Sequence, residues 1–384
     1  MDMARIRPTR ADIDLDAIQY NVRALRKLTP EAQLMAVVKA DGYGHGAVPV
    51  ARAALEAGAS WLGIAAMEEG AALRAAGITA PTLIFGYVPP AQASAVIAHN
   101  LRPALFDLPF ARALSDAAQA AGRRAPVHLK ADTGMGRIGK RAPEIVAFAR
   151  EVAALPGIEI EGIFTHLATA DEPENDYAAR QLATFDSILG DLKAAGIDPS
   201  LKHACNSAGI MLHREGHYDL VRAGIALYGL PPDPGVTWPV ALKPALTWRT
   251  QVALVKTVEA GTPVSYGCTY RAPARERIAT LPVGYADGLF RLLSNKGEVL
   301  IHGRRCPIVG RVCMDQTMVR VPDDIAVQPG DAVILIGEQD GERITASDMA
   351  RTIGTINYEI VCAISRRVPR IYWKDGRPQE SGIL

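Results

Sequence analysis

Short apolar runs alternate with alanine-rich amphipathic stretches between residues 34 and 225, and this alternation constrains the fold more than any other feature. The stretches between the runs have helical periodicity, and several end in glycine, which commonly stops a helix. Strands separated by helices pair in parallel, because each crossover needs a dozen or more residues. The sequence therefore predicts an α/β fold with a closed (β/α)8 barrel. The eight expected strands are 34–39, 61–65, 82–86, 102–106, 126–132, 160–168, 201–206 and 218–224.

The pattern changes after the proline-rich segment 231–239, where β-rich runs with short Gly/Pro turns replace the alternation. We therefore expect two domains. The (β/α)8 barrel is expected over residues 10–238 and a smaller, mainly β-strand domain over 239–384, with residues 1–9 packing on the second domain.

Charge and cysteine content exclude several classes of function. Lys and Arg number 42 and Asp and Glu 41, so the formal charge is +1, which argues against nucleic-acid partners and against attachment to an acidic membrane. The five cysteines form no CxxC pair, so neither a disulfide framework nor a zinc site is expected, and no metal is predicted. The N-terminus lacks the apolar core of a signal peptide, and the uncharged stretch 75–101 is broken by Pro and Gly. These features favour the cytoplasm.

Polar residues end several of the expected barrel strands, at the rim where barrel enzymes place their active sites. Lys39 ends the first strand and is a candidate for Schiff-base chemistry, although it could simply mark the solvent end of the strand. Ser207 and the backbone N–H groups of Gly224 and Ile225 could form a phosphate cradle, although Ser207 could instead be a helix N-cap. A Schiff-base lysine facing a phosphate site is the arrangement that pyridoxal 5'-phosphate needs.

Three other motifs are weaker candidates. The GxGxxG pattern at 134–139 matches a dinucleotide-binding loop, but the surrounding repeat is not a Rossmann half. His213 and His217 lack the HExxH order of zinc proteases. Cys205 and Cys313 could be nucleophiles, although free cysteines more often act as small buried hydrophobes.

The chain resembles the bacterial alanine racemases, which are fold-type III pyridoxal-phosphate enzymes. The resemblance extends over nearly the whole chain, in ordered blocks that span both expected domains. These blocks are AVVKADGYGHG (36–46), HLKADTGMGRIG (128–139), THLATADE (165–172), CNSAG (205–209), VRAGIALYG (221–229), VSYGCTY (264–270), PVGYADG (282–288), VGRVCMDQ (309–316) and NYEIV (357–361).

The resemblance implies an isomerase that interconverts L- and D-alanine by a two-base mechanism, for D-alanine biosynthesis and peptidoglycan in the cell wall. Lys39 would hold pyridoxal phosphate as an internal aldimine and act as the base on D-alanine. The reaction would proceed through the external aldimine of the substrate. Tyr266 would be the opposite base, acting on L-alanine, with Arg222 and His166 as a relay behind it. Arg222 would also face the pyridine nitrogen, where an arginine cannot accept a proton.

The remaining implied residues fall into four groups. Besides Lys39 and Arg222, the cofactor would contact Tyr43, Asn206, Ser207, Gly224, Ile225 and Tyr358. The substrate carboxylate would meet Arg137, Met314, Cys313 and Asp315. Lys130 would be carbamylated and pair with Arg137, or be an unmodified strand-end lysine. Asp171, Tyr285, Arg291 and Arg311 would line a narrow entrance, or be ordinary surface residues.

Tyr266 and its neighbours lie far along the chain from Lys39, and the resemblance implies that a second copy supplies them in a homodimer with shared active sites. Three alternatives stay open. One is a barrel-type pyridoxal-phosphate decarboxylase, which would want a carboxylate where Arg222 stands. Another is a serine or broad-specificity racemase. The third is a non-catalytic pyridoxal-phosphate carrier protein, which would leave Tyr266 without a role.

Overall fold

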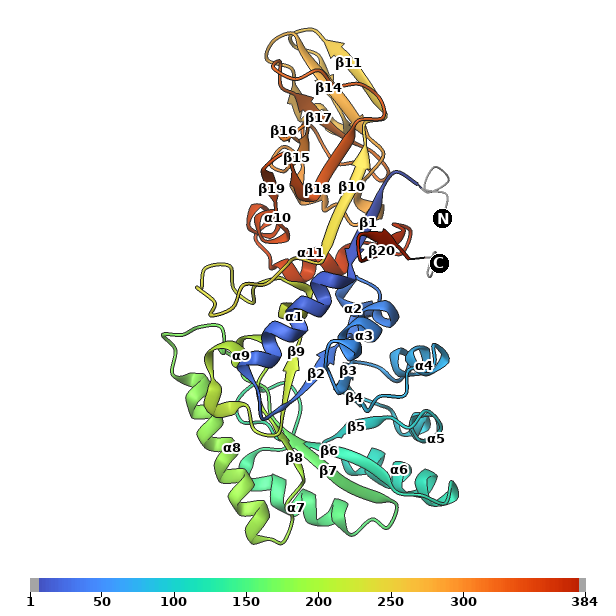
Figure 1. Ribbon diagram of the computed structural model, residues 1–384, viewed down its shortest axis with the longest axis vertical. Coiled ribbons are helices and arrows are strands. Elements are labelled where there is room, and N and C mark those ends of the chain that lie inside the picture. The colour runs from blue at the N-terminus through green and yellow to red at the C-terminus, as the bar shows by residue number, and fades with distance from the viewer. Residues whose placement is uncertain (1–6, 380–384) are drawn as a thin grey trace. The chain divides into compact units, whose positions relative to one another are not determined.

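The computed structural model describes residues 7–379, which divide into two compact units. Unit 1 contains the described residues 7–16, the short segment 43–46 and residues 245–379. Unit 2 contains residues 17–42 and 47–244. Figure 1 labels the elements of both units.

Unit 2 is built on eight parallel strands in the order β8-β7-β6-β5-β4-β3-β2-β9. Backbone N–H groups of Asp219 and Arg222 donate to the carbonyls of Lys202 and Cys205 at 3.1 and 3.0 Å, and these two bonds bring the first and last strands of the row together. The barrel predicted from the eight apolar runs is therefore confirmed. The strands are β2 (Gln33–Val37), β3 (Trp61–Ile64), β4 (Thr82–Ile84), β5 (Arg102–Leu105), β6 (Ala125–Lys130), β7 (Ile158–Phe164), β8 (Leu201–His203) and β9 (Leu220–Ala223).

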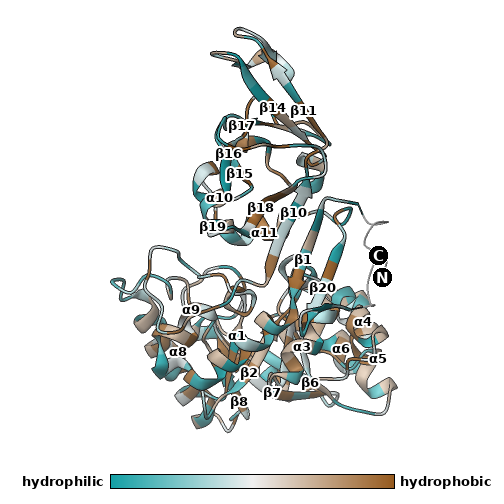
Figure 2. Ribbon diagram, turned by 45° about the horizontal axis from the view of Figure 1, so that its top comes forward, coloured by the Kyte–Doolittle hydropathy of each residue, from teal (hydrophilic) through white to brown (hydrophobic). Residues whose placement is uncertain are grey.

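Helices follow the barrel strands and bury one face each. Helix α6, for example, buries Phe110, Leu114 and Ala118, which recur at intervals of about one helical turn. Figure 2 shows hydrophilic and hydrophobic residues within single helices such as α8, as that pattern requires. The helices of this region are α1 (Leu15–Leu28), α2 (Lys39–Tyr43), α3 (Ala47–Glu56), α4 (Met67–Ala75), α5 (Ala93–Ala98), α6 (Leu108–Ala120), α7 (Ala142–Ala153), α8 (Tyr177–Ala194) and α9 (Ser207–Leu212), with 3-10 turns η2 (Pro90–Gln92), η3 (Arg214–Gly216) and η4 (Ile225–Tyr228).

Unit 1 is mainly β-sheet, as expected for the second domain. Its large sheet has the order β16-β15-β18-β10-β1-β20-β21, with β19 on β18, and the smaller sheets are β11-β14-β17 and β12-β13. The strands are β1 (Arg10–Asp14), β10 (Leu246–Gln251), β11 (Leu254–Val258), β12 (Pro263–Val264), β13 (Tyr270–Arg271), β14 (Glu276–Leu281), β15 (Glu298–Ile301), β16 (Arg304–Pro307), β17 (Thr317–Val321), β18 (Ala332–Gln339), β19 (Glu342–Ile344), β20 (Arg370–Lys374) and β21 (Arg377–Pro378). The helical segments are η5 (Tyr266–Cys268), η6 (Tyr285–Asp287), η7 (Arg291–Leu293), α10 (Ala346–Ile353) and α11 (Asn357–Ala363).

The two units differ from the expected domain ranges at both ends of the barrel. Strand β1 pairs antiparallel with β10 and parallel with β20, so residues 10–14 belong to the sheet of unit 1 rather than to the barrel. Its alternate residues Ala11 and Ile13 are fully buried there. The barrel has no place for this strand because eight other strands fill its row. At the other end unit 2 extends to residue 244 instead of 238.

Part of the expected N-terminal segment 1–9 can be located. Thr9 is buried and its hydroxyl lies 2.8 Å from that of Thr250, while Arg7 forms an ion pair with the buried Asp287. Both contacts lie within unit 1. Residues 1–6 lie outside the described part of the chain.

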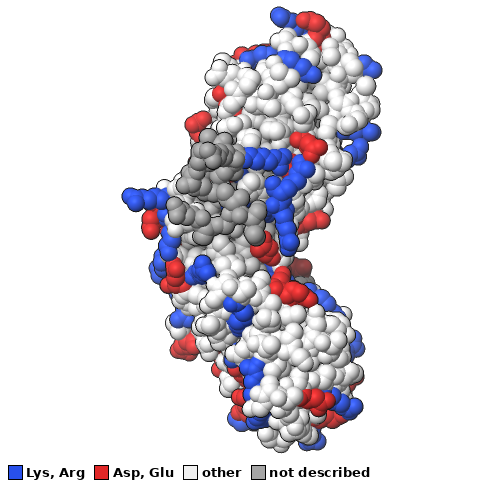
Figure 3. Space-filling view, turned by 90° about the vertical axis from the view of Figure 1, so that its right-hand side faces the viewer, with Lys and Arg blue, Asp and Glu red and all other residues white. Residues whose placement is uncertain are grey.

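The distribution of surface charge and the lengths of the helices both bear on the predictions about nucleic-acid and membrane partners. On the face drawn in Figure 3, acidic and basic residues are interspersed. Over residues 7–379, no helix has the length and apolar character that crossing a membrane would require.

The N-cap of α6 gives a test of the barrel's local energetics. Asp107 Oδ1 accepts the backbone N–H of Phe110 at 2.9 Å. Asp107→Ala is expected to lower the free energy of unfolding by about 1 kcal/mol, because one N–H at the helix start loses its acceptor. Urea unfolding followed by circular dichroism measures the change. Asp116→Ala, the same substitution at an exposed position of α6, is the control and should not destabilise the protein; equal losses in both variants would contradict the capping argument.

Candidate active site

Lys39 directly follows β2 and opens a turn with unusual backbone geometry. The φ angles of Ala40, Asp41, Gly42 and Tyr43 are +52°, +51°, +62° and +52°, which is one turn in the left-handed region. For residues other than glycine this conformation costs free energy, so other contacts must hold it. Glycine at position 42 suits the turn because glycine adopts positive φ without strain.

Two carboxylates hold the left-handed turn in place. Glu69 accepts the backbone N–H of Ala40 at 2.7 Å, and Asp41 accepts the backbone N–H of Ala47 at 2.8 Å. These two hydrogen bonds fix the backbone that follows Lys39, whose side chain is half-buried.

Arg222, on β9, is buried in the barrel with its guanidinium surrounded by acceptors. Nη2 donates to the carbonyls of Thr165 and Ala204 at 2.9 and 2.7 Å, and Nη1 donates to His203 Nδ1 at 2.9 Å. Burial lowers the pKa of Arg222 to about 10, which leaves the group charged at neutral pH.

His166 follows β7 and lies beside this arginine, with Nδ1 at 3.3 Å from Arg222 Nη2. Burial, followed by the positive charges of Arg222 and Arg137, holds the pKa of His166 well below its usual value. The imidazole is therefore neutral at pH 7 and can accept a hydrogen bond from the arginine.

Lys130 ends β6 inside the barrel and is 2% exposed. Its Nζ donates to the carbonyl of Ala131 at 2.7 Å. Burial and the charge of Arg222 lower the pKa of Lys130 to about 7, so a large fraction of this amine is neutral at physiological pH. Arg137 lies on the exposed part of the loop that follows the same strand, between Gly136 and Ile138.

The loops after β8 and β9 are joined through Ser207. Its hydroxyl oxygen accepts the backbone N–H groups of Gly224 at 2.9 Å and Ala226 at 3.3 Å. Asn206 caps α9 by accepting the N–H of Gly209 at 3.0 Å. Ser207 and Gly224 are thus brought together as the sequence predicted, although Gly224 N–H is directed at the serine rather than outward. Ile225 begins η4 directly after this contact.

Unit 1 carries the other predicted residues. Tyr43 belongs to this unit, and its ring lies 6.2 Å from that of Tyr358 on α11. Burial, then the nearby Tyr358 and Cys362, raise the pKa of Tyr43, so its phenol stays protonated and can donate.

Tyr266 begins η5 and is 70% exposed. The preceding Ser265 donates to the carbonyl of Arg311 at 2.6 Å and lies 3.5 Å from Cys313 Sγ. The structure therefore brings the Tyr266 turn next to the 311–313 segment.

Met314 and Asp315 lie on a turn fixed from two sides. The backbone N–H groups of Tyr285 and Ala286 donate to the carbonyls of Cys313 and Met314 at 2.9 and 3.0 Å. Arg367 donates to Asp315 at 2.6 Å and also binds Asp287. Met314 and Tyr285 are 52% and 43% exposed, so this apolar surface is available to further contacts. Arg291 is exposed at the start of η7.

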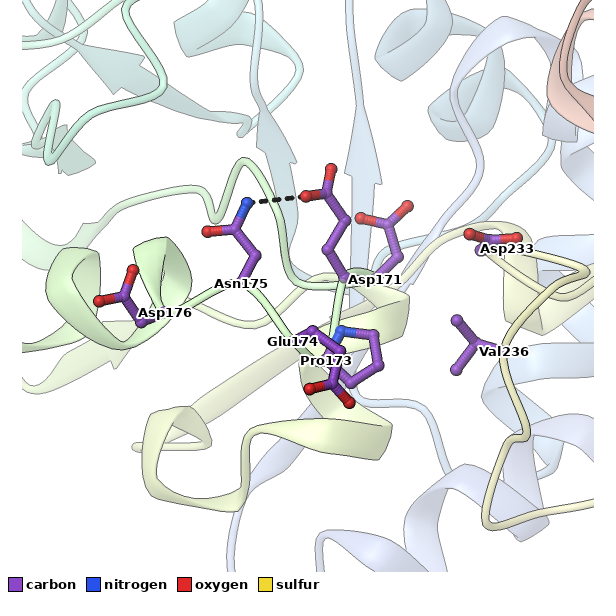
Figure 4. A pocket seen from close by; sticks show the side chains of 8 residues that line it. Asp171, Pro173, Glu174, Asn175, Asp176, Asp233 and Val236 are labelled. Carbon is purple, nitrogen blue, oxygen red and sulfur yellow. Dashed lines mark hydrogen bonds between the residues drawn. The ribbon is translucent and has the colours of Figure 1, made fainter.

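Asp171 lines a cavity of about 570 Å³ that is rich in carboxylates (Figure 4). The cavity lies between the loop before α8 and the loop that contains Asp233 and Val236, and Asn175 donates to Glu172 at 2.7 Å within it.

The weaker sequence candidates have structural roles instead. The carboxylate of Asp132 accepts the N–H groups of Gly134 and Gly136 at 3.1 and 3.0 Å. These two N–H groups of the glycine-rich loop are therefore bonded within the loop. His217 Nε2 bonds to the carbonyl of Ile210. Burial raises the pKa of Cys205 to about 12, which opposes a thiolate role. Among residues 7–379 no cluster of three metal-ligating side chains occurs.

Sequence reasoning missed a group of polar residues inside the barrel. His128 and His203 are fully buried on β6 and β8, and Glu161 on β7 lies 3.3 Å from His128 Nε2 and forms an ion pair with Arg102 on β5. The sequence signal that could have revealed this group is a polar residue within an otherwise apolar strand, because a buried polar group needs hydrogen-bond partners.

The comparisons with known proteins agree along the chain. The family model described as "Alanine racemase, N-terminal domain" matches residues 13–232, and "Alanine racemase, C-terminal domain" matches residues 245–372. The curated alanine racemase of Symbiobacterium thermophilum is 60% identical over 372 residues, which cover 97% of this chain and 99% of that protein. The chain belongs to the alanine racemase family.

Solved structures of the family share the fold. The alanine racemase of Clostridium difficile 630 has a TM-score of 0.93 and 40% identity, with 97% of both chains covered. A histidine racemase from Leuconostoc mesenteroides has a TM-score of 0.88 and 30% identity over 96% of this chain and 98% of that one. Enzymes named alanine racemase are isomerases, and this member of the family is one by the same resemblance.

The neutral histidines of this racemase-family barrel predict a pH dependence of stability. Burial is the first cause that holds the pKa values of His128, His166 and His203 below the usual value. The unfolded chain takes up protons below about pH 6.5 while the folded barrel does not, so acid favours unfolding. Stability should fall by up to about 1.4 kcal/mol per pH unit per histidine as the pH drops below about 6.5.

Thermal unfolding at pH values from 8 to 5 measures this dependence. His203→Gln should flatten it, and His99→Gln, at the C-terminal end of α5, should leave it unchanged. A His203→Gln slope equal to that of the wild type would contradict the assignment.

Proposed function

We propose that this protein is a pyridoxal-phosphate-dependent alanine racemase that interconverts L- and D-alanine. The observation that carries the proposal is the placement of Lys39 and Arg222 at the ends of β2 and β9, on a chain 60% identical over its length to a curated alanine racemase. A histidine racemase shares the fold, so the fold alone does not choose the side chain of the substrate. The higher identity to alanine racemases favours alanine.

The donor set fits pyridoxal phosphate. Lys39 supplies an amine on a fixed turn, Arg222 a buried guanidinium, and Ser207 a hydroxyl where the loops after β8 and β9 meet. The cofactor would also contact Asn206, Gly224, Ile225, Tyr43 and Tyr358. When bound, the cofactor would supply an aldehyde carbon for an amine and a conjugated ring that spreads the electron pair left by a departing α-proton.

Two proton carriers of the chain perform the inversion. For the L-to-D direction the phenolate oxygen of Tyr266 accepts the α-proton, and Nζ of Lys39 returns a proton from the opposite face. For the reverse direction the amine of Lys39 accepts and the phenol of Tyr266 donates. Each group must be within hydrogen-bond reach of the α-carbon's proton in the bound substrate.

Arg222 would face the ring nitrogen of the bound cofactor. A guanidinium has donors only, so it cannot hold that nitrogen protonated as a carboxylate would. With the cofactor bound, this would limit how far the electron pair left by the α-proton is spread and would favour racemisation over transamination. The contact between Arg222 and His166 supports their role as a relay behind Tyr266.

The carboxylate of alanine would be bound by Arg137 and by the backbone N–H of Met314, beside Cys313 and Asp315. Tyr285, Arg291, Arg311 and Asp171 would restrict the entrance to small side chains. Because Tyr266 is 70% exposed in the single chain, we propose a homodimer in which each copy completes the site of the other. A cytoplasmic enzyme of this kind would supply D-alanine for peptidoglycan.

Tyr266→Phe separates the two bases. In deuterated buffer the variant should lose α-proton exchange from L-alanine and keep exchange from D-alanine, because only the acceptor for the L-enantiomer is removed. Racemisation should fall on the order of 10²- to 10⁴-fold. Proton NMR follows exchange, and a retained imine absorbance shows that the cofactor is bound. Tyr87→Phe, at another exposed tyrosine, is the control; equal loss of exchange from both enantiomers would refute the assignment.

Lys130 is expected to carry a carbamate, which would pair with Arg137. Its neutral amine attacks carbon dioxide and releases one proton, so the product should accumulate as the pH rises above about 7, the pKa of this buried amine. Carbon-13 NMR with labelled bicarbonate should show the carbamate in the wild type and in Lys140→Ala, but not in Lys130→Ala. No carbamate signal in the wild type at pH 8 would show that Lys130 is unmodified.

A further inference from the structure

A chain of hydrogen bonds runs through the barrel from Arg222 to the ion pair of Glu161 and Arg102. Arg222 Nη1 lies 2.9 Å from His203 Nδ1, His203 Nε2 lies 2.8 Å from His128 Nδ1, and His128 Nε2 lies 3.3 Å from Glu161 Oε2. Arg102 Nε donates to the same carboxylate oxygen at 3.3 Å. Both histidines are 0% exposed, so bulk solvent does not reach their ring nitrogens.

The pairing of β6 with β7 is irregular at the point where this series of hydrogen bonds crosses the two strands. On β7, Ile160 pairs with Val127 and Gly162 pairs with His128, so Glu161 is an extra residue that forms a bulge. Bulges re-aim side chains and are common beside active sites. The bulge coincides with the contact of Glu161 to His128.

Gly162 makes the bond between the two histidines possible. β7 lies between β6 and β8 (Figure 1), so the imidazoles must meet across it. A Cβ on residue 162 would lie 2.6 Å from His128 Nδ1, which is closer than real side chains approach. The ring of Phe164 stacks on His203 at a centroid distance of 4.8 Å and fixes its plane.

The two ends determine where the protons lie. A guanidinium can only donate and a carboxylate can only accept. His203 must therefore accept at Nδ1 and carry its proton on Nε2, from which it donates to His128 Nδ1. His128 in turn donates from Nε2 to Glu161. Both rings are consequently neutral and have the same tautomer.

The charged groups around the histidines are consistent with this pattern. Burial lowers the pKa of both, and Arg222 adds to the lowering at each. Burial opposes ionisation of Glu161, but its contacts with His128 and Arg102 outweigh that effect and lower its pKa. In its unmodified and protonated form Lys130, on the strand of His128, also disfavours protonation of His203.

We propose that Glu161, held by Arg102, is a positioning residue that fixes the tautomers of His128 and His203 and thereby keeps an acceptor directed at Arg222. Without an acceptor at position 161, the Nε2–H of His128 would be buried and unsatisfied, which is costly. Moving the proton to Nδ1 would relieve this, but His203 would then carry its proton on Nδ1, facing an N–H of Arg222. The guanidinium would lose one of its fixed bonds.

Histidine tautomers in the cofactor-loaded protein test this directly. Nitrogen-15 NMR of histidine-labelled protein should show the neutral Nε2–H form at both positions in the wild type. Glu161→Gln keeps an acceptor and should keep this pattern. Glu161→Leu removes it, and the Nδ1–H form should appear at His203. Glu159→Leu, the same change at an exposed position of β7, is the control and should resemble the wild type.

Kinetics provide the second readout, which rests on the proposed function of Arg222. Glu161→Leu should lower kcat for alanine racemisation on the order of tenfold with KM nearly unchanged, the loss expected for one buried hydrogen bond. Glu161→Gln and Glu159→Leu should retain kcat.

Three results would overturn the inference. The first is an Nδ1–H tautomer of His203 in the wild type, which needs no variant to detect. The second is a His203 tautomer that does not change in Glu161→Leu. The third is a changed tautomer with unchanged kcat. A wild-type protein that does not racemise alanine would refute the proposed function instead, and the NMR results would still decide the tautomers.

Discussion

The charge of Arg222 is the constraint to which the barrel interior is adapted. The guanidinium is 2% exposed and can only donate hydrogen bonds, so every close neighbour must accept. Two backbone carbonyls and His203 do so, and His166 lies within reach as a further acceptor. Such a group is costly to bury unless it is fully bonded. Its position therefore depends on neutral histidines, and these in turn depend on the carboxylate of Glu161.

The sequence was sufficient for the barrel and for the residues at the ends of its strands. Eight apolar runs separated by helices leave few alternatives, and the rule that barrel sites lie at strand ends identified Lys39, His166, Ser207 and Arg222. The hydrogen-bonded histidines were not predictable, because their contact depends on a bulge at Glu161 that shifts the register of β7. Residues 10–14 were also included in the expected range of the barrel, whereas their pairing with β10 and β20 places them in the sheet of unit 1.

The division of the chain into two units bears on the chemistry. Unit 2 holds the amine and the arginine, whereas unit 1 holds Tyr266 on an exposed turn beside Cys313. Tyr266 is 70% exposed in the single chain, so water would solvate the proton carrier that we propose at this position. Placing it against a second copy of the chain would remove that water and complete the site at the same time.

Mixing two inactive variants measures this sharing of residues most directly. The Lys39→Ala and Tyr266→Phe variants are co-expressed, or are mixed, denatured and refolded together, so that mixed dimers form. If the site combines Lys39 of one copy with Tyr266 of the other, each mixed dimer has one intact site. The mixture should then recover about a quarter of the wild-type racemase activity, because half of randomly formed dimers are mixed. No recovery, with mixed dimers present by mass spectrometry, would contradict the account.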